Sequence, residues 1–419
     1  MTPDVNIQLQ VGGQTIPVFQ FECTGSAYGS VGSATATTSL AALAGQQIDL
    51  YAITTQGAGV TPVTIDVALG PGQRTRIFGG EYLTTTWNMD EDQVSIHARS
   101  WAGVLADQKR ILTKIGTAVQ KTLAPLAPGR VSAAGISNQN QTVGMIVTAI
   151  ANEFGFTPVL NLSGSNNPTI GTLYGSADQT FMPVPQSLWS ILNQLARDTG
   201  YVVYDTPNKQ LVFGAPGAGL PTLTFSYNVP PPQNVQPARR LVLTHHPRRN
   251  STFRVLVIAY DPAKAQVGIG RAAYVGANYA GSNGLSAGLS TGSSAVSADA
   301  KLAKLDQGAN QIPLYTFHMD GLTQAQADTQ AAAIASDIAK RELLISFEAD
   351  GLPGIAQTQM MKLTGNVPSP FTQPTFYASG FSHSFVLPER KTKDNRAGFL
   401  TRIKGLNIPT EALAAETAG

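Results

Sequence analysis

The first hundred residues alternate between apolar and polar positions, which is the pattern of half-buried β-strands. Val5–Val11 and Thr15–Glu22 both alternate, and Gly12-Gly13 between them is a hairpin signal. Further alternating runs follow at Val63–Leu69, Arg74–Phe78, Tyr82–Trp87 and Val94–Ala98. Several short strands joined by polar turns predict a β-barrel or a β-sandwich.

After residue 100 the apolar spacing becomes helical. Ser100 is a candidate N-cap for a short helix that has Trp101, Val104 and Leu105 on one face. Two longer helices follow. The first ends at Gly155, and its apolar positions are Val143, Ile146, Val147, Ile150, Ala151 and Phe154. The second has Ser187 as its candidate N-cap and Gly200 as its C-terminal stop, and its apolar positions are Leu188, Ile191, Leu192, Leu195 and Ala196. Two short strands, Tyr201–Asp205 and Gln210–Gly214, complete a predicted α+β module.

A proline-rich stretch, Val229–Pro232, marks a boundary because proline cannot donate a hydrogen bond to a sheet. Strand patterns resume at Arg240–Thr244 and Phe253–Tyr260. From Ala272 to Ala298 the chain has no charged residue and consists mostly of Gly, Ala and Ser. We interpret this tract as a flexible loop, or as an insertion that becomes ordered against a partner.

A capped helix opens the last hundred residues. Thr323 and Gln326 have capping-box spacing, and Lys340 and Arg341 stand in the last turn, where the helix dipole favours cations. The apolar stripe of this helix is narrow, which suits close packing on a sheet, and it consists of Ala327, Ala331, Ile334 and Ile338. Strand patterns follow at Leu343–Glu348, Met360–Leu363, Phe376–Phe385 and Gly398–Ile403, with a turn at Gly351–Gly354.

The composition indicates a folded chain with few charges. Only 13% of the 419 residues are charged, whereas 42% are hydrophobic, which is normal for a globular protein. A chain that is poor in charge but rich in apolar residues often covers its surface with subunit contacts. The net charge of +2 argues against a dedicated nucleic-acid binder, which would be strongly basic.

The single cysteine and the hydropathy exclude several classes of protein. Cys23 alone cannot form an internal disulfide framework or a cysteine-rich zinc site, and we interpret it as a half-buried strand residue. No run of residues is apolar over the roughly 18 positions that a transmembrane helix needs, so we expect no membrane insertion. The N-terminus lacks the basic start and apolar core of a signal peptide, so we expect a protein that is synthesised in the cytoplasm.

Three short patterns could carry chemistry, and each has a simpler interpretation. Ser286 and Ser290 both match the nucleophile-elbow pattern, but they lie in a tract where such matches arise by chance. Gly268–Ala273 resembles a loose dinucleotide fingerprint without a βαβ unit, so we predict a turn. Asp90-Glu91-Asp92 lacks calcium-loop spacing, so we predict a solvated turn, with an intersubunit salt bridge as the alternative.

Histidines and arginines give no better argument for catalysis. His245-His246 lies in a basic patch that suggests an anion or nucleic-acid contact, a polar edge strand, or charges that meet acids of a neighbouring subunit. The patch contains Arg239, Arg240, Arg248, Arg249 and Arg254. His97, His318 and His383 are isolated on strands and lack partners at metal-ligand spacing. We therefore expect no enzyme, no metal and no cofactor.

Three blocks of sequence resemble the tail hub proteins of contractile-tailed phages, the late-control or baseplate-hub family. The first is the strand-to-helix step Val94–Asp107, and the second is the helix, glycine and aromatic strand of Ser187–Tyr204 followed by Gln210–Gly214. The third is the capped helix with its closing strands, including Gly380-Phe-Ser-His383 and Gly398-Phe-Leu-Thr401. Each block is common by itself, and their order and spacing carry the resemblance.

The resemblance implies a mainly β fold with α+β insertions, in which two tail-tube-like β-barrel domains flank a small α+β module. The first β domain would comprise residues 1–105 plus about 215–239, and the module residues 106–214. The second β domain would comprise residues 240–405 with an insertion at about 262–310, followed by a tail at 406–419. Leu223–Tyr227 is the candidate strand that returns to the first domain.

The resemblance also implies a function in assembly. A homotrimer would display six similar domains in a ring that joins the tail tube to the trimeric central spike, around a channel through which DNA passes. The expected partners are the spike, the tail tube or a tube initiator, other baseplate proteins and the C-terminus of the tape measure protein. The expected location is the tail baseplate of the virion, after assembly in the host cytoplasm.

Six residues are candidates for subunit contacts. The basic strand edge offers Arg248, Arg249 and Arg254, and the C-terminal strand offers Phe381, His383 and Phe385. Two other functions stay open. A tail-associated cell-wall hydrolase would need paired carboxylates in a groove. The hub of a type VI-like spike or of a long flexible tail tip is the other alternative, although the type VI form normally continues into a spike domain and no β-helical repeat follows here.

Overall fold

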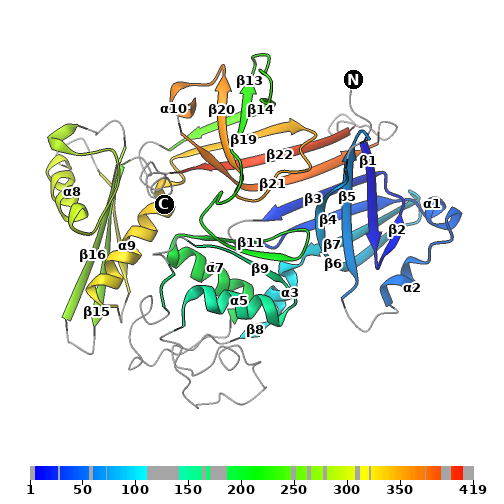
Figure 1. Ribbon diagram of the computed structural model, residues 1–419, viewed down its shortest axis with the longest axis horizontal. Helices are drawn as coiled ribbons and strands as arrows, with labels where there is room; N and C mark the ends of the chain where they lie inside the picture. The colour runs from blue at the N-terminus through cyan, green and yellow to red at the C-terminus, as the bar shows by residue number, and fades with distance from the viewer. Residues whose placement is uncertain are drawn as a thin grey trace, which may run out of the picture.

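The computed structural model describes residues 5–26, 29–55, 60–71, 73–110, 141–162, 167–169, 186–246, 252–261, 266–276, 281–306, 312–319, 322–372, 374–387 and 398–408. Two β units lie next to each other in it, with a middle α+β module below them and an inserted α+β unit at the left (Figure 1). The predicted fold class, mainly β with α+β insertions, is confirmed. Among the described residues, no helix is both long enough and apolar enough to cross a membrane.

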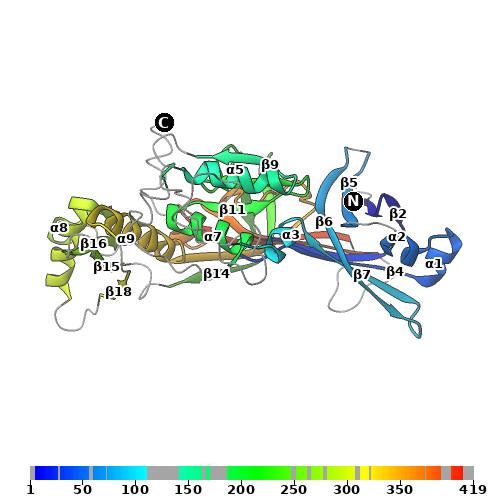
Figure 2. The same ribbon diagram turned by 90° about the horizontal axis from the view of Figure 1, so that it is seen from below.

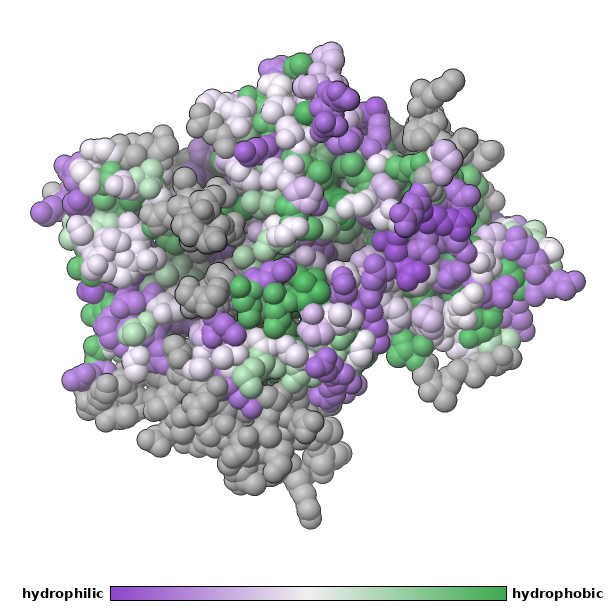
Figure 3. Space-filling view, viewed as in Figure 1, coloured by the Kyte–Doolittle hydropathy of each residue, from purple (hydrophilic) through white to green (hydrophobic). Residues whose placement is uncertain are grey.

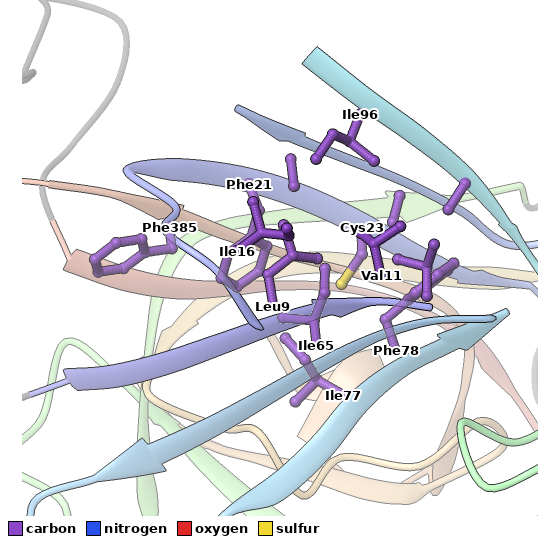
Figure 4. Close-up of a cluster of buried hydrophobic side chains, with 14 of the residues drawn as sticks. Leu9, Val11, Ile16, Phe21, Cys23, Ile65, Ile77, Phe78, Ile96 and Phe385 are labelled. Carbon is purple, nitrogen blue, oxygen red and sulfur yellow. The ribbon is translucent and has the colours of Figure 1, made fainter. Parts of the chain in front are cut away.

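The first β unit is built from consecutive strands. Its strand order is β2-β1-β5-β6-β7-β4-β3, and the bounds are β1 Val5–Val11, β2 Gln14–Ile16, β3 Gln20–Ser26, β4 Ser33–Thr38, β5 Pro62–Leu69, β6 Thr75–Asn88 and β7 Gln93–Ser100. Two short helices, α1 (Leu40–Gly45) and α2 (Leu50–Thr55), connect β4 to β5. Alternate side chains of these strands point inward and form one apolar core, in which Leu9, Phe21, Cys23 and Ile65 come together (Figure 4).

The second β unit closes on itself. Its strands are β13 Leu223–Tyr227, β14 Gln236–His245, β19 Leu343–Asp350, β20 Met360–Gly365, β21 Phe376–Val386 and β22 Gly398–Asn407. They pair in the order β21-β20-β13-β14-β19-β22, and β22 pairs again with β21. Leu223–Tyr227 therefore lies between β14 and β20 in the second unit and not in the first, where the sequence placed it. A short helix, α10 (Ser369–Thr372), packs beside this unit.

The middle module follows the predicted pattern closely. Its helices are α3 Ala102–Asp107, α5 Val143–Glu153 and α7 Leu188–Thr199. Its sheet has the strand order β11-β12-β9, with bounds Val202–Asp205, Gln210–Gly214 and Thr157–Asn161. Two further short strands, β8 (Lys109–Arg110) and β10 (Gln186–Ser187), pair with each other. Ser187 caps α7 through Ser190 N, and Gly200 ends it in a left-handed conformation with φ 74°. Ser100, in contrast, is the last residue of β7 and caps no helix.

The inserted unit spans 252–339 and interrupts the second β unit. Its sheet has the order β17-β16-β15-β18, with bounds Gly288–Thr291, Gln266–Val275, Thr252–Asp261 and Leu314–His318. A turn of 3-10 helix (Ser282–Gly284) precedes β17, helix α8 (Gly292–Leu305) follows it, and α9 is Gln324–Ala339. The capping box of Thr323 and Gln326 is present as predicted.

Helix α9 packs closely on this inserted sheet. Ala327, Ala331, Ala335 and Ala339 are fully buried against it, and any side chain at Gly270 would overlap the backbone of Ala327. Gly268–Ala273 is therefore part of a strand, not the predicted turn, and its glycines allow the helix to approach. The uncharged tract contains β17 and the start of α8, so its described part is ordered within the chain.

Candidate assembly surface

Strand β21 joins the two β units. It pairs with β3 of the first unit over seven residue pairs, from Gly380↔Ser26 to Val386↔Gln20. Its other neighbours, β22 and β20, belong to the second unit. The strands of both units therefore form one continuous 13-stranded sheet.

One face of this joined sheet is polar. Strand pairing places six side chains from six strands in one row: Arg99, Ser33, Thr24, Ser382, Arg402 and Glu348. The next row contains Thr84, His97, Thr35, Glu22 and Ser384. The residues between these positions, such as Phe21, Ala34, Ile96 and Phe385, are buried on the other face. In Figure 2 the middle module lies above the sheet, and the lower side is more open.

Several charges on the polar face are paired within the chain. Glu348 accepts hydrogen bonds from Arg402 (3.0 Å) and Arg240 (3.2 Å), and Arg239 forms an ion pair with Asp350 at 2.7 Å. Although burial acts to raise it, the contacts with the two arginines hold the pKa of Glu348 below its ordinary value. At the other end of the row, Arg99 forms ion pairs with Glu81 and Asp107.

Hydroxyl groups fill the centre of the polar face. The hydroxyls of Thr24 and Ser33 are 3.0 Å apart, and Thr35 Oγ1 lies 3.2 Å from His97 Nδ1. The centre of this face is therefore formed by small hydroxyl side chains, and its arginines are paired with acids, so the face is not strongly basic.

Two of the three candidate contacts on β21 occupy interior positions. His383 is buried, its Nδ1 lies 3.0 Å from Thr401 Oγ1, and burial lowers the pKa of its imidazole to about 3. Phe385 is also buried and stacks on Phe21 with ring centroids 6.0 Å apart, whereas Phe381 is half-buried beside His383. The sequence suggested a barrel edge, but β21 has neighbours on both sides.

The basic patch is dispersed. Arg254 is buried in the inserted unit, where it forms ion pairs with Asp299 of α8 (3.8 Å) and with Asp306 at the end of that helix (2.6 Å). It is therefore not on an exposed strand edge. His245 lies 3.8 Å from Glu342. Arg248 and Arg249, like the tail beyond Ile408, lie outside the described residues.

A cavity of about 480 Å³ lies where the two β units meet the middle module, and its walls include Asp205, Phe381 and His383. The buried carboxylate of Asp205 accepts hydrogen bonds from the Ser100 hydroxyl and from Ala102 N, both at 3.0 Å, and burial raises its pKa to about 6. Asp205 therefore supplies the acceptor at the start of α3 that the sequence assigned to Ser100.

The structure places the sequence candidates for chemistry in strands, turns and loops. No group of three or more His, Cys, Asp or Glu side chains among them has the arrangement of a metal site. Ser290 is paired with Ala273 inside β17, and Ser286 lies in the loop before that strand. Asp90 and Glu91 lie in the predicted turn, and Asp92 accepts a hydrogen bond from Ala41 N at 3.2 Å.

No protein-family model and no curated protein sequence matches this chain. Its structure is similar to that of a tail protein from Neisseria meningitidis MC58, with a TM-score of 0.60 and 12% identity over 96% of both chains. It is also similar to the 43 kDa tail protein of prophage MuSo2 from Shewanella oneidensis, with a TM-score of 0.53 and 13% identity over 95% of this chain and 97% of the other. The chain therefore has the fold of these tail proteins over nearly its whole length.

Proposed function

We propose that this protein is a structural hub of a phage tail baseplate and has no catalytic role. The observation that carries the proposal is the continuous sheet in which β21 joins two β units of six or more strands each. Because each chain presents two such units next to each other, three copies related by threefold symmetry provide six units in a ring. The fold shared with two solved tail proteins supports the same role.

In this proposal the ring joins a sixfold tail tube to a threefold spike. Its partners are the spike, the tube or a tube initiator, other baseplate proteins and the tape measure C-terminus, and the ring belongs to the tail baseplate of the virion. The polar face of the joined sheet lines the channel. Paired charges and hydroxyls suit a wall past which DNA moves, because a strongly basic surface would retain a polyanion.

The oligomeric mass of the full-length chain tests this proposal. We expect a trimer by light scattering or native mass spectrometry, either for the chain alone or after co-expression with the products of the neighbouring genes. Electron microscopy of the trimer should show a ring with six similar lobes. A chain that stays monomeric in the presence of the spike and tube proteins would contradict the proposed function.

A further inference from the structure

Apolar side chains alone do not single out one surface of this protein. Figure 3 shows hydrophobic side chains in several separate places on one face of the molecule, with polar side chains between them. A buried charge without a partner is a more specific signal, because burial of a charge costs free energy that only an opposite charge or hydrogen bonds recover. Among the described residues, such a charge occurs at the end of helix α9, where Lys340 is only 7% exposed.

Lys340 follows the last residue of α9 and has no acid of its own. The acid whose charge acts on it, Asp337, forms an ion pair with Arg341 at 3.1 Å. The part of the chain that the structure describes supplies no hydrogen bond or ion pair to the Lys340 ammonium group. Burial accordingly lowers the pKa of Lys340 below its ordinary value, and the charge of Asp337 only partly opposes this shift.

A cavity of about 340 Å³ lies between the ends of α7 and α9, and Lys340 lines it. The two helices lie side by side in Figures 1 and 2. Arg197, in the last turn of α7, and Arg341 line the same cavity, so that three cations share it with one described acid, Asp337. Helix dipoles favour cations at such ends, but this contribution is small compared with the cost of burying an ammonium group. The cavity is therefore suited to an anion.

A larger cavity, of about 810 Å³, adjoins the first one and shares Arg197, Ala333 and Asp337 with it. It also contains one more acid, Asp198. Its apolar walls are only partly buried, and they include Val31, Phe317, Met319, Ile334 and Ile338. We call the two cavities together the α7–α9 groove. The groove has apolar walls along its larger part and a cationic end at Lys340.

The last described strand ends next to this groove. Leu406 of β22 pairs with Leu344, and the side-chain amide of Asn407, with its nitrogen turned towards α9, donates to Lys340 O at 2.6 Å. Residues 409–419 follow Ile408 and lie outside the described residues. They contain Glu411, Glu416, one leucine and four alanines, and no lysine or arginine. A segment of eleven residues reaches up to about 36 Å, so it can extend from Ile408 into the groove.

We propose that residues 409–419 occupy the α7–α9 groove of their own chain and bring a glutamate carboxylate to Lys340 and Arg197. The segment and the groove match in charge, because an acidic segment starts beside a buried cation that lacks an acid. They also match in their apolar content. Since α7 belongs to the middle module and α9 to the inserted unit, this contact would tie the two together. The inference does not depend on the proposed trimer.

Paired cysteines test where the segment lies. The full-length variant with Gln194→Cys and Ala412→Cys, treated with a short bismaleimide, is expected to form a crosslink within one chain, found by mass spectrometry of the monomer. Gln194 is exposed and lines the groove. Cys23 can remain, because it is buried and burial raises the pKa of its thiol. The matched control is Lys304→Cys with Ala412→Cys, since Lys304 is exposed on α8 of the inserted unit but does not line the groove; it should stay unlinked.

A double-mutant cycle in the full-length chain tests the charge contact. Lys340→Met removes the buried cation, and Glu411→Gln with Glu416→Gln removes the carboxylates assigned to it. The changes in melting temperature should depart from additivity by about 2 °C, because Lys340→Met breaks an ion pair only while the carboxylates are present. Lys340→Met combined with Glu91→Gln is the control and should be additive, since Glu91 is an exposed acid in the turn between β6 and β7.

Inorganic phosphate distinguishes the other possible occupants of the groove. At constant ionic strength it should raise the melting temperature of the glutamine variant more than that of the wild-type chain, because only the variant leaves the cationic end open. Equal stabilisation of both would show that the groove is free for small anions and would overturn the inference. Additive changes without a crosslink would overturn it as well, as would crosslinks found only between chains. Each of these outcomes leaves the proposed function intact.

Discussion

The two β units have similar architectures but are assembled differently from the chain. The first takes all its strands from residues 5–100, in which most neighbours are joined by short connections. The second takes its strands from three segments, 223–245, 343–365 and 376–407, and accommodates the inserted unit of residues 252–339 between them. A similar layer of strands can therefore form from local or from distant pairings, provided that each segment contributes alternating apolar residues.

The units also differ in how their cores are bounded. Phe225 and Phe347, whose ring centroids are 4.6 Å apart, lie in a core formed only by strands of the second unit and their connections. The core of the first unit, in contrast, includes Phe385 of β21 and Phe399 of β22. Phe21 packs against both of these rings, with centroid distances of 6.0 Å and 6.3 Å. The first core therefore depends on the last strands of the chain.

The largest expected effect comes from removing these aromatic rings. Phe21→Ala and Phe225→Ala should each lower the free energy of unfolding by about 3–5 kcal/mol, because each leaves a cavity in a packed core. Hydrogen exchange should then distinguish them. Phe21→Ala should accelerate exchange in β21 and β22 as well as in the first unit, whereas Phe225→Ala should act mainly on the second unit. Confinement of the Phe21→Ala effect to β1–β7 would show that the cores are independent.

His383 gives a pH test of the junction between the units. Its pKa is about 3 in the folded chain and about 6.5 when unfolded, so the unfolded state binds more protons between these values. Stability is therefore complete above pH 6.5 and falls as the pH is lowered towards 3. Between pH 6.5 and 5, the free energy of unfolding of the wild-type chain should fall by about 2 kcal/mol because of this group, and in His383→Asn this fall should be absent. Denaturant unfolding at several pH values measures the difference.

Asp205→Asn is the matched control, because the folded pKa of Asp205 is raised to about 6 and its contribution has the opposite sign. The wild-type chain gains stability from this group as the pH falls from 6 towards 4, and the variant should lose that gain. If His383→Asn left the pH dependence unchanged, His383 would have to be accessible to water, and the junction would be less tightly packed than the structure shows.

The last of these predictions concerns the inserted unit. Gly270→Ala should destabilise it by about 1–3 kcal/mol, because the new methyl group overlaps the Ala327 backbone. Gly268→Ala should have a smaller effect, since its methyl group would lie 3.3 Å from Gln324 Cα, a tight contact that a shift of a few tenths of an ångström relieves. Thermal unfolding of both variants checks this difference. Equal effects of the two substitutions would mean that α9 does not lie as close to the strand as described.

Local patterns in the sequence predicted most individual elements. The capping residues around α7, the capping box of α9 and the alternating strands of the first unit all act within a few residues, so short-range chemistry determines them. The prediction that Leu223–Tyr227 returns to the first unit is wrong because a strand pattern does not specify the partners of the strand. This strand pairs in parallel with residues 361–365, and that choice depends on tertiary packing.

The candidate contacts were harder to predict for the same reason. Alternation along Phe376–Val386 is the same whether the strand lies at an edge or between two neighbours, and β3, which covers it, is more than 350 residues away in sequence. Arg254 looked exposed because its acidic partners lie on α8 and at its end, far along the chain. The polar face has a detectable signal, the Ser and Thr residues at alternate positions of β4, but only strand register shows that it continues through both units.

The pairing of β3 with β21 has a mechanical consequence. The two strands are antiparallel neighbours over seven residue pairs. A force that pulls the units apart along the strand direction loads these hydrogen bonds in shear, so they must break together rather than one after another. Strain that enters one unit along this direction is therefore passed to the other through the backbone hydrogen bonds between β3 and β21.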